Sequence, residues 1–235
     1  MTVPSPEIRT MHPFRHRSGV AVSFALLASF SVATHAADPA LVWDGLNADF
    51  FSDDDGPFTI GFQFRTQTDI RVTALGAFDH LGDGFIDAHT VGIWTVGNES
   101  PLITATIPAG AETSLVGAFR YVDIAGFTLA ANTDYIVAAS GFYGSVGDLY
   151  ASLILANQFY ASPGITFEGS RGAAEAPGLN YPTGFREPLS PTTFGANFQF
   201  ATIPEPSTWI LLVLGGGLLA KACLRSRPQD PKSGR

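Results

Sequence analysis

The sequence predicts an all-β protein whose central region folds as a jelly-roll-like β-sandwich. Short segments in which apolar and polar residues alternate recur between glycine-rich turns, and the 235 residues include 25 Gly and 16 Pro. Such strands expose one face and bury the other, so two sheets have to pack face to face. Between Asp38 and Ile203 no apolar repeat with the helical period of about 3.6 residues runs for a useful length.

The strands follow from this alternation in chain order. The first is predicted at 58–64, where the apolar side chains are Phe58, Ile60, Phe62 and Phe64. Further strands are predicted at 70–74, 91–95, 103–107, 119–124, 135–139 and 194–200. We expect the first and last of these strands to be adjacent. The segments 141–161 and 162–191 are predicted to be long loops, with a short strand within 149–155 as an alternative.

The charge of the central region excludes several classes of partner. Between Asp38 and Ile203 there are 18 acidic residues against five arginines and no lysine, a net charge of −13, compared with −8 for the whole chain. Such a region repels phosphate backbones and anionic lipid surfaces, so nucleic acid is a poor partner. The only cysteine is Cys223, which excludes a disulfide or a cysteine-ligated metal in the central region.

The first 36 residues are predicted to be a secretory signal peptide. A basic segment with Arg15 and Arg17 precedes the apolar, small-residue run 19–32. Thr34 and Ala36 then place small residues at the −3 and −1 positions, which predicts cleavage after Ala36. Met1 and Met11 are both open as the start. A transmembrane anchor is the alternative, but the apolar run is short for one.

The C-terminal region 203–235 joins a Pro-Glu-Pro motif, an apolar helix and a basic tail. The motif is Pro204, Glu205 and Pro206. Because proline cannot continue a helix, the apolar helix is predicted over 207–224, about 27 Å at ~1.5 Å per residue. This length is marginal for a bilayer core of about 30 Å. The basic residues after it favour a cytoplasmic C-terminus.

This combination resembles the PEP-CTERM sorting signal. In that family the tail holds an exported protein in the inner membrane, and a membrane protease called exosortase recognises the Pro-Glu-Pro region. The resemblance implies exosortase and the export machinery as partners. A plain single-pass anchor, with no cleavage of the tail, is the alternative. The stretch from Ala74 to Tyr135 also resembles an uncharacterised β-sandwich domain of PEP-CTERM proteins, which implies a fold and a surface location and no known chemistry.

Three groups of residues are candidates for chemistry. The loop from Asp79 to His89 gathers aspartate and histidine, which suits Ca²⁺ or, in the structural alternative, a polar hairpin. Asp53, Asp54 and Asp55 could add ligands or form a solvated turn. Aromatic residues in the predicted loops could stack on sugar rings or belong to the core: Phe142, Tyr143, Tyr150, Phe159, Tyr160, Tyr181 and Phe185.

The sequence assigns no catalytic, cofactor-binding or metal-binding residue. It has no G-x-S-x-G elbow, H-E-x-x-H, P-loop or dinucleotide fingerprint. We therefore expect three parts: signal peptide 1–36, extracytoplasmic β-sandwich 37–202 and sorting signal 203–235. The expected function is that of a non-enzymatic protein of the cell envelope, cell surface or biofilm matrix of a Gram-negative-type bacterium. The alternatives are a carbohydrate-binding module for exopolysaccharide, with or without Ca²⁺, and an enzyme acting on polysaccharide.

Overall fold

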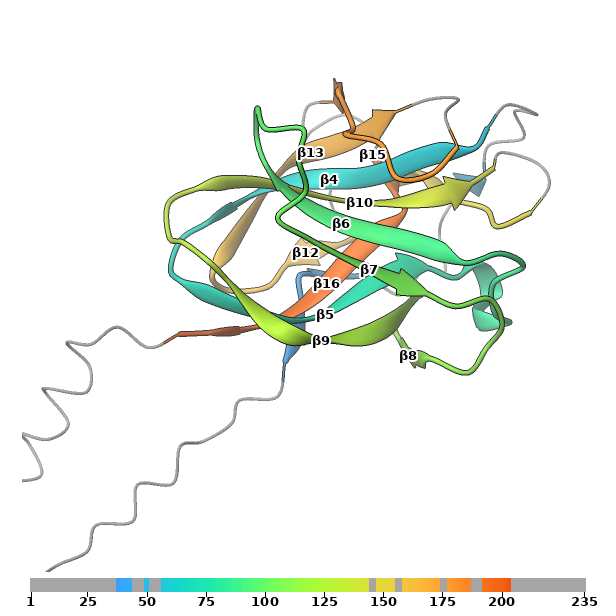
Figure 1. Cartoon of the computed structure of the whole chain (residues 1–235), viewed down its shortest axis with the longest axis horizontal. Coiled ribbons are helices and arrows are strands. Elements are labelled where there is room, and N and C mark those ends of the chain that lie inside the picture. The colour runs from blue at the N-terminus through green and yellow to red at the C-terminus, as the bar shows by residue number, and fades with distance from the viewer. Residues whose placement is uncertain are drawn as a thin grey trace, which may run out of the picture. The chain divides into compact units, whose positions relative to one another are not determined.

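The computed structural model confirms the all-β prediction. It describes residues 37–43, 49–50, 56–143, 147–154, 158–173, 177–186 and 192–203. Within these ranges there is no α-helix, and the one helical turn is the 3₁₀ helix η1 (His80–Gly82). Two curled antiparallel sheets pack against each other, as expected for strands with one buried face (Figure 1). The predicted signal peptide, Asp53–Asp55 and the Pro-Glu-Pro tail lie outside the described residues.

The two large sheets contain the long strands. In order across the first sheet these are β1 (Asp38–Pro39), β16 (Ala196–Thr202), β5 (Ile70–Phe78), β9 (Phe119–Leu129) and β8 (Ser114–Val116). In order across the second they are β14 (Gly184–Arg186), β13 (Ile165–Ala173), β4 (Phe58–Thr66), β10 (Asp134–Phe142), β6 (His89–Thr95) and β7 (Ile103–Ile107). Two small sheets are formed by β15 (Thr192–Phe194), β11 (Ala151–Ile154) and β3 (Asp49–Phe50), and by β12 (Tyr160–Ala161) and β2 (Leu41–Val42).

The chain crosses repeatedly from one large sheet to the other. From β4 it passes to β5 in the first sheet, returns to β6 and β7 in the second, and crosses again to β9 and back to β10. After β13 and β14, also in the second sheet, it ends on β16 in the first. This alternation is the kind of double Greek-key path that a jelly roll uses.

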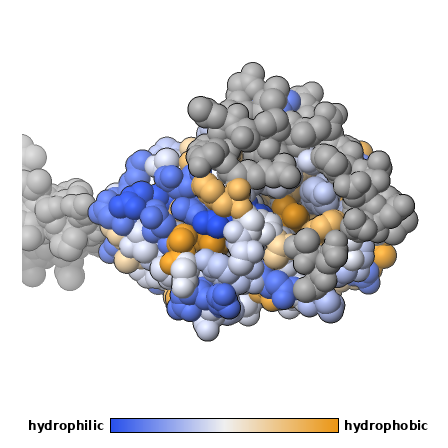
Figure 2. Space-filling view, turned by 90° about the horizontal axis from the view of Figure 1, so that it is seen from above, coloured by the Kyte–Doolittle hydropathy of each residue, from blue (hydrophilic) through white to orange (hydrophobic). Residues whose placement is uncertain are grey.

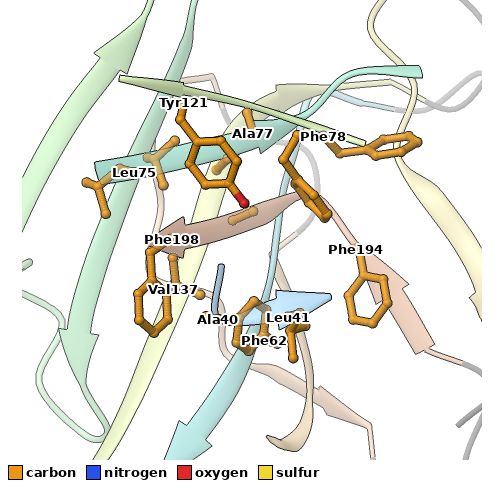
Figure 3. Packing of buried hydrophobic residues seen from close by; sticks show 14 of the residues in the cluster. Ala40, Leu41, Phe62, Leu75, Ala77, Phe78, Tyr121, Val137, Phe194 and Phe198 are labelled. Carbon is orange, nitrogen blue, oxygen red and sulfur yellow. The ribbon is translucent and has the colours of Figure 1, made fainter. Parts of the chain in front are cut away.

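The core lies between the sheets and is rich in phenylalanine. Phe62 of β4 and Phe198 of β16 are fully buried in this core (Figure 3). Phe64 of β4 is also fully buried, and its ring centroid is 4.7 Å from that of Phe198. On β16 the neighbouring Asn197 is also fully buried; its side chain accepts a hydrogen bond from the Leu41 N–H at 3.1 Å and donates to the Leu41 carbonyl at 2.8 Å. Strand β16 thus joins the core to the N-terminal segment around Leu41.

A smaller apolar cluster covers the outer face of the second sheet. Trp94 is buried there with Ile136 and Ala138, whereas Val91 and Ile93 of the same strand belong to the main core. The segment between β13 and β14 lies over them through Leu179 and Tyr181. Seen from above Figure 1, the described surface over β13 and β15 carries small apolar patches between polar residues (Figure 2).

Two expectations about the strands were wrong. The segment 162–191 is not all loop, because β13 pairs along its nine residues with β4. Its glycines fit a bulged strand: the register shifts between Phe167 and Gly169. The predicted first and last strands, β4 and β16, are not adjacent in one sheet, because they belong to opposite sheets and face each other across the core. The predicted short strand within 149–155 is β11.

The strands run between two ends of the sandwich, which we call the tail pole and the far pole. The tail pole is where β16 ends, at Thr202, beside the start of β1 at Asp38. The far pole is the opposite end, where β5 ends at Phe78, β10 ends at Phe142 and β6 begins at His89. In Figure 1 β1 and the end of β16 lie together at the lower left, and η1 lies at the right.

Replacing Gly61 by alanine is expected to lower the free energy of unfolding by about 2–3 kcal/mol, as overpacking of a tight interior does. A Cβ at Gly61 would lie 1.8 Å from the Val137 carbonyl oxygen of β10, so the strands would have to separate. At Gly172, on the neighbouring strand, the nearest atom is 3.7 Å away. Gly172→Ala is therefore the matched control and should change stability by less than about 0.5 kcal/mol. Equal denaturation midpoints for the two variants would contradict the close approach of β4 and β10.

Candidate functional site

Asp79, at the start of the predicted Ca²⁺ loop, is a buried structural residue. Its carboxylate accepts hydrogen bonds from the Gly84 N–H, at 3.1 and 3.3 Å, and from Arg120 Nε at 2.5 Å. Arg120 is equally buried, and it donates further to the carbonyl oxygens of Ala111, Thr113 and Gly82, each at 2.8 Å. The ion pair therefore ties two loop segments of the far pole, 79–84 and 111–113, to β9, and the Asp79 oxygens are occupied by N–H donors.

His89, at the other end of that loop, is fully buried and hydrogen-bonded at both ring nitrogens. Nδ1 lies 2.7 Å from the Ser140 carbonyl oxygen and Nε2 lies 3.0 Å from Asp148 Oδ2. Carbonyl and carboxylate oxygens only accept hydrogen bonds, so a ring that is protonated at both nitrogens satisfies both contacts. Phe85 and Phe142 lie close to the ring, with centroid separations of 4.3 and 4.6 Å.

Asp148 is the anion that completes this arrangement. In addition to its contact with His89, the carboxylate accepts hydrogen bonds from the backbone N–H groups of Ile86, at 2.9 and 3.1 Å, and of Asp87, at 3.0 Å. Burial acts to raise the pKa of Asp148, but these hydrogen bonds and the charge of His89 outweigh it and hold the pKa below its ordinary value of 3.8. Asp148 thus fastens the predicted loop 141–161 to the loop that precedes β6.

The far pole does not present a ready cation site. A hollow of about 360 Å³ lies there, lined by Asp79, Asp83 and Asp148 among others. Two of these carboxylates already accept several N–H donors, as described above, and Asp83 is exposed. Among the residues that the structure describes, no group of three or more His, Cys, Asp or Glu side chains could hold a metal ion.

The aromatic residues of the predicted loops do not form one surface. Phe142 and Phe159 pack in the main core, and Tyr181 packs on Trp94 and accepts the Gly97 N–H at 2.8 Å. Tyr160, on β12, is 61% exposed. Tyr150 and Phe185 share a cavity of about 310 Å³ beside β13 and β14. Phe142 and Phe159 therefore belong to the core, and Tyr150 and Phe185 line a cavity.

The remaining candidate is the tail junction, where the described chain ends. The last residue of β16, Thr202, pairs with Ile70, and the Ile203 N–H donates to the Asp69 carbonyl at 2.9 Å. The Asp69 carboxylate in turn accepts the Ala131 N–H at 2.8 Å. The residue that follows Ile203 is a proline, which has no N–H to donate, so the pairing cannot continue beyond this point as a regular ladder.

Comparison with known families identifies this junction. The model of the PEP-CTERM protein-sorting motif matches residues 202–227. The tail is a PEP-CTERM sorting signal. The match includes Pro204, Glu205 and Pro206 and most of the predicted apolar helix, and it starts on the last residue of β16. A search of curated proteins found no match to the chain.

The PEP-CTERM signal implies exosortase as a processing partner, with export and sorting to the cell envelope. In the part of the chain that the structure describes, no helix is long and apolar enough to cross a membrane. The helix predicted at 207–224 and the cleavage predicted after Ala36 lie outside that part.

The sequence did not reveal which residues pair with His89 and Asp79 at the far pole. Asp148 is the single charged residue of the segment 141–161, and Arg120 is one of the five arginines of the central region. A lone charge in an apolar stretch is a usable signal, because a buried charge needs a partner. The identity of that partner was not readable, since Asp148 is 59 residues from His89 and Arg120 is 41 residues from Asp79.

Replacing Asp148 by asparagine is expected to lower the free energy of unfolding at pH 7 by about 2 kcal/mol, because the amide turns an NH₂ group toward N–H donors. The folded-state pKa of Asp148 is lowered, so its stabilisation is complete above its ordinary pKa of 3.8 and is lost as pH falls below it. The difference between parent and variant should therefore shrink below about pH 4.

The matched control for Asp148→Asn is Asp83→Asn, an exposed residue that lines the same hollow. Urea titrations of both variants and the parent between pH 3 and 7 would measure the effect. A stability difference for Asp148→Asn that does not change with pH would contradict the assignment of a carboxylate–imidazolium pair.

Proposed function

We propose that the chain is a non-enzymatic exported protein that is displayed at the bacterial cell surface or in the extracellular matrix after exosortase acts on its tail. The observation that carries the proposal is the position of the sorting signal. It begins on the last residue of the sandwich, at Thr202, with no linker between the fold and the motif. A folded extracytoplasmic domain joined directly to a sorting tail has the organisation of a cargo protein.

The short junction supports a defined orientation at the membrane. Only Pro204, Glu205 and Pro206 separate Ile203 from the start of the predicted helix at Ser207, a span of about 10–14 Å at ~3.3–3.6 Å per residue. Before processing, the tail pole would therefore lie against the inner membrane and the far pole would point away from it. Asp38, just after the predicted signal cleavage, also lies at the tail pole.

Two features support a role without catalysis. At the far pole, the candidates Asp79 and His89 and their neighbour Asp148 donate or accept hydrogen bonds within the protein. A general base or nucleophile needs a free lone pair directed at a substrate. The standard catalytic sequence motifs are also missing from the chain.

Changing Pro204, Glu205 and Pro206 together to alanine is expected to abolish processing, because the residues that define the motif are removed. The measurement is intact mass and cell fractionation in a host with and without exosortase. In the host with exosortase, the parent should give a species that starts at Ala37 and has lost the predicted helix 207–224. In the host without exosortase, the parent should keep this helix. Pro228→Ala with Pro231→Ala, outside the matched residues, is the control and should be processed normally. A full-length tail in the membrane fraction of both hosts would overturn the sorting proposal.

A second candidate function is saccharide binding by the sandwich. The observation that favours it is the cavity beside β13 and β14, whose lining includes Tyr150 and Phe185, with Phe185 43% exposed. Aromatic faces bind sugar rings by stacking in sites with a few polar groups. Since no metal cluster is present among the described residues, we propose binding that does not require Ca²⁺.

Phe185→Ala is expected to reduce retention on exopolysaccharide at least tenfold, because it removes an exposed ring of the cavity. Tyr160→Ala, which removes an exposed aromatic side chain that does not line the cavity, is the matched control and should leave retention unchanged. Pull-downs with and without a chelator would measure both effects. Equal losses for the two variants, or a loss caused by the chelator alone, would contradict this site.

A further inference from the structure

Strand β7 is an edge strand without the features that protect the other edges of the two large sheets. It is the last strand of the second sheet, beside β6, and no described strand pairs with its outer edge (Figure 1). The edge strands β1, β8 and β14 have only two or three residues each, and β1 and β14 also contain charged residues. β7 has five residues with no charge, proline or glycine, and it pairs with β6 in regular register. Such an edge is open to pairing with another strand.

The side chains of β7 alternate between the core and the solvent. Its odd-numbered residues are apolar and pack on the core, whereas Thr104 and Thr106 are exposed. The Thr106 hydroxyl already lies 3.2 Å from the hydroxyl of Thr90 on β6. Ile103 and Ala105 are only half-buried, so a strand added at this edge would remove more apolar surface from water.

The sequence of β7 reads the same in both directions, Ile-Thr-Ala-Thr-Ile. If two copies of the strand pair antiparallel about a two-fold axis at Ala105, Ile103 lies opposite the partner's Ile107. Thr104 then lies opposite the partner's Thr106, and every residue meets one of its own type. Pairs of threonines directly opposite each other stabilise antiparallel strands. A two-fold interface requires this kind of self-complementary surface.

The charge of the molecule and the flanking prolines restrict where copies can meet. The region from Asp38 to Ile203 has a net charge of −13, so two copies repel each other at long range. β7 itself adds no charge to this repulsion. Pro101 and Pro108 lie on either side of the strand and cannot donate to a ladder. The paired segment is therefore confined to residues 102–107, which favours a single register.

We propose that two copies of the chain associate through β7, which joins their second sheets into one antiparallel sheet across a two-fold axis. The contact uses the open edge of both copies, so it closes a pair and leaves no equivalent edge for a third copy. One short strand buries less than the roughly 1,600 Å² of a standard interface, so the pair forms mainly at high local concentration. Display of many copies on one surface supplies that concentration. The inference goes beyond the proposed display and does not depend on saccharide binding.

Cysteine cross-linking tests the contact and its register, with the full chain lacking the predicted signal peptide, in detergent, and carrying Cys223→Ser. Ala105→Cys places a thiol at the two-fold axis, so oxidation with diamide should give a disulfide-linked dimer. Thr104→Cys alone should give at least tenfold less dimer, because the two thiols would be offset by two residues and too far apart to bridge. Thr104→Cys mixed with Thr106→Cys should give a mixed dimer. Intact mass without reductant measures each product.

Sedimentation velocity over a range of protein concentrations tests the same edge without cysteines. Thr104→Glu is expected to weaken the dimer at least tenfold, because the added carboxylate would lie at the paired edge. Thr166→Glu is the matched control, since it makes the same charge change at an exposed threonine of β13, three strands away from β7 across β4, β10 and β6. Thermal melts report whether each variant is folded.

Three outcomes would overturn the proposal. The first is a parent that stays monomeric at every concentration, together with no dimer from Ala105→Cys. The second is equal cross-linking of Ala105→Cys and Thr104→Cys, which would indicate random collisions and no two-fold register. The third is equal weakening by Thr104→Glu and Thr166→Glu, which would assign the association to overall charge and not to β7.

Discussion

The packing of Phe198 on β16 against Phe64 on β4 is the contact on which the rest of the structure depends. It joins the two sheets at the centre of the core, with ring centroids 4.7 Å apart. On the same strand Asn197 holds the N-terminal segment through Leu41, and Ile203 leads directly into the sorting signal. Because β16 makes all three connections, the folded core determines where the chain leaves the sandwich toward the sorting signal.

The far pole illustrates how an acidic domain without disulfides orders its loops. The pair of Arg120 with Asp79 binds backbone groups of the segments 82–84 and 111–113, and the pair of His89 with Asp148 binds those of Ile86, Asp87 and Ser140. The carboxylates that looked like metal ligands are therefore structural. Buried charges with satisfied hydrogen bonds specify one arrangement of loops, because any other arrangement would leave a charge unpaired in the interior. Arg171 is the contrasting case, because its hydrogen bonds to described residues go to Gln63 and Thr183 and to no carboxylate.

The sheet edge formed by β13 and β14 was not predicted from the sequence. The alternation in β4, β5 and β6 is regular and predicted these strands and their buried faces correctly. In β13 a bulge at Gly169 interrupts the alternation, and the surrounding Gly and Pro residues resemble a loop. β13 is a strand because it pairs with β4. This pairing is a nonlocal effect that local sequence patterns do not show.

The sequence by itself determined the all-β class and the sorting signal, because alternation and the Pro-Glu-Pro tail are properties of neighbouring residues that can be read along the chain. The tertiary structure decided which residues meet. Arg171 and Gln63 are 108 residues apart, and His89 and Asp148 are 59 apart, so only the pairing of distant strands brings each pair together. These tertiary contacts decide whether the side chain of an Asp, His or Arg bonds within the protein or is available to a ligand. The reason is that burial and hydrogen bonding are set by neighbours in space.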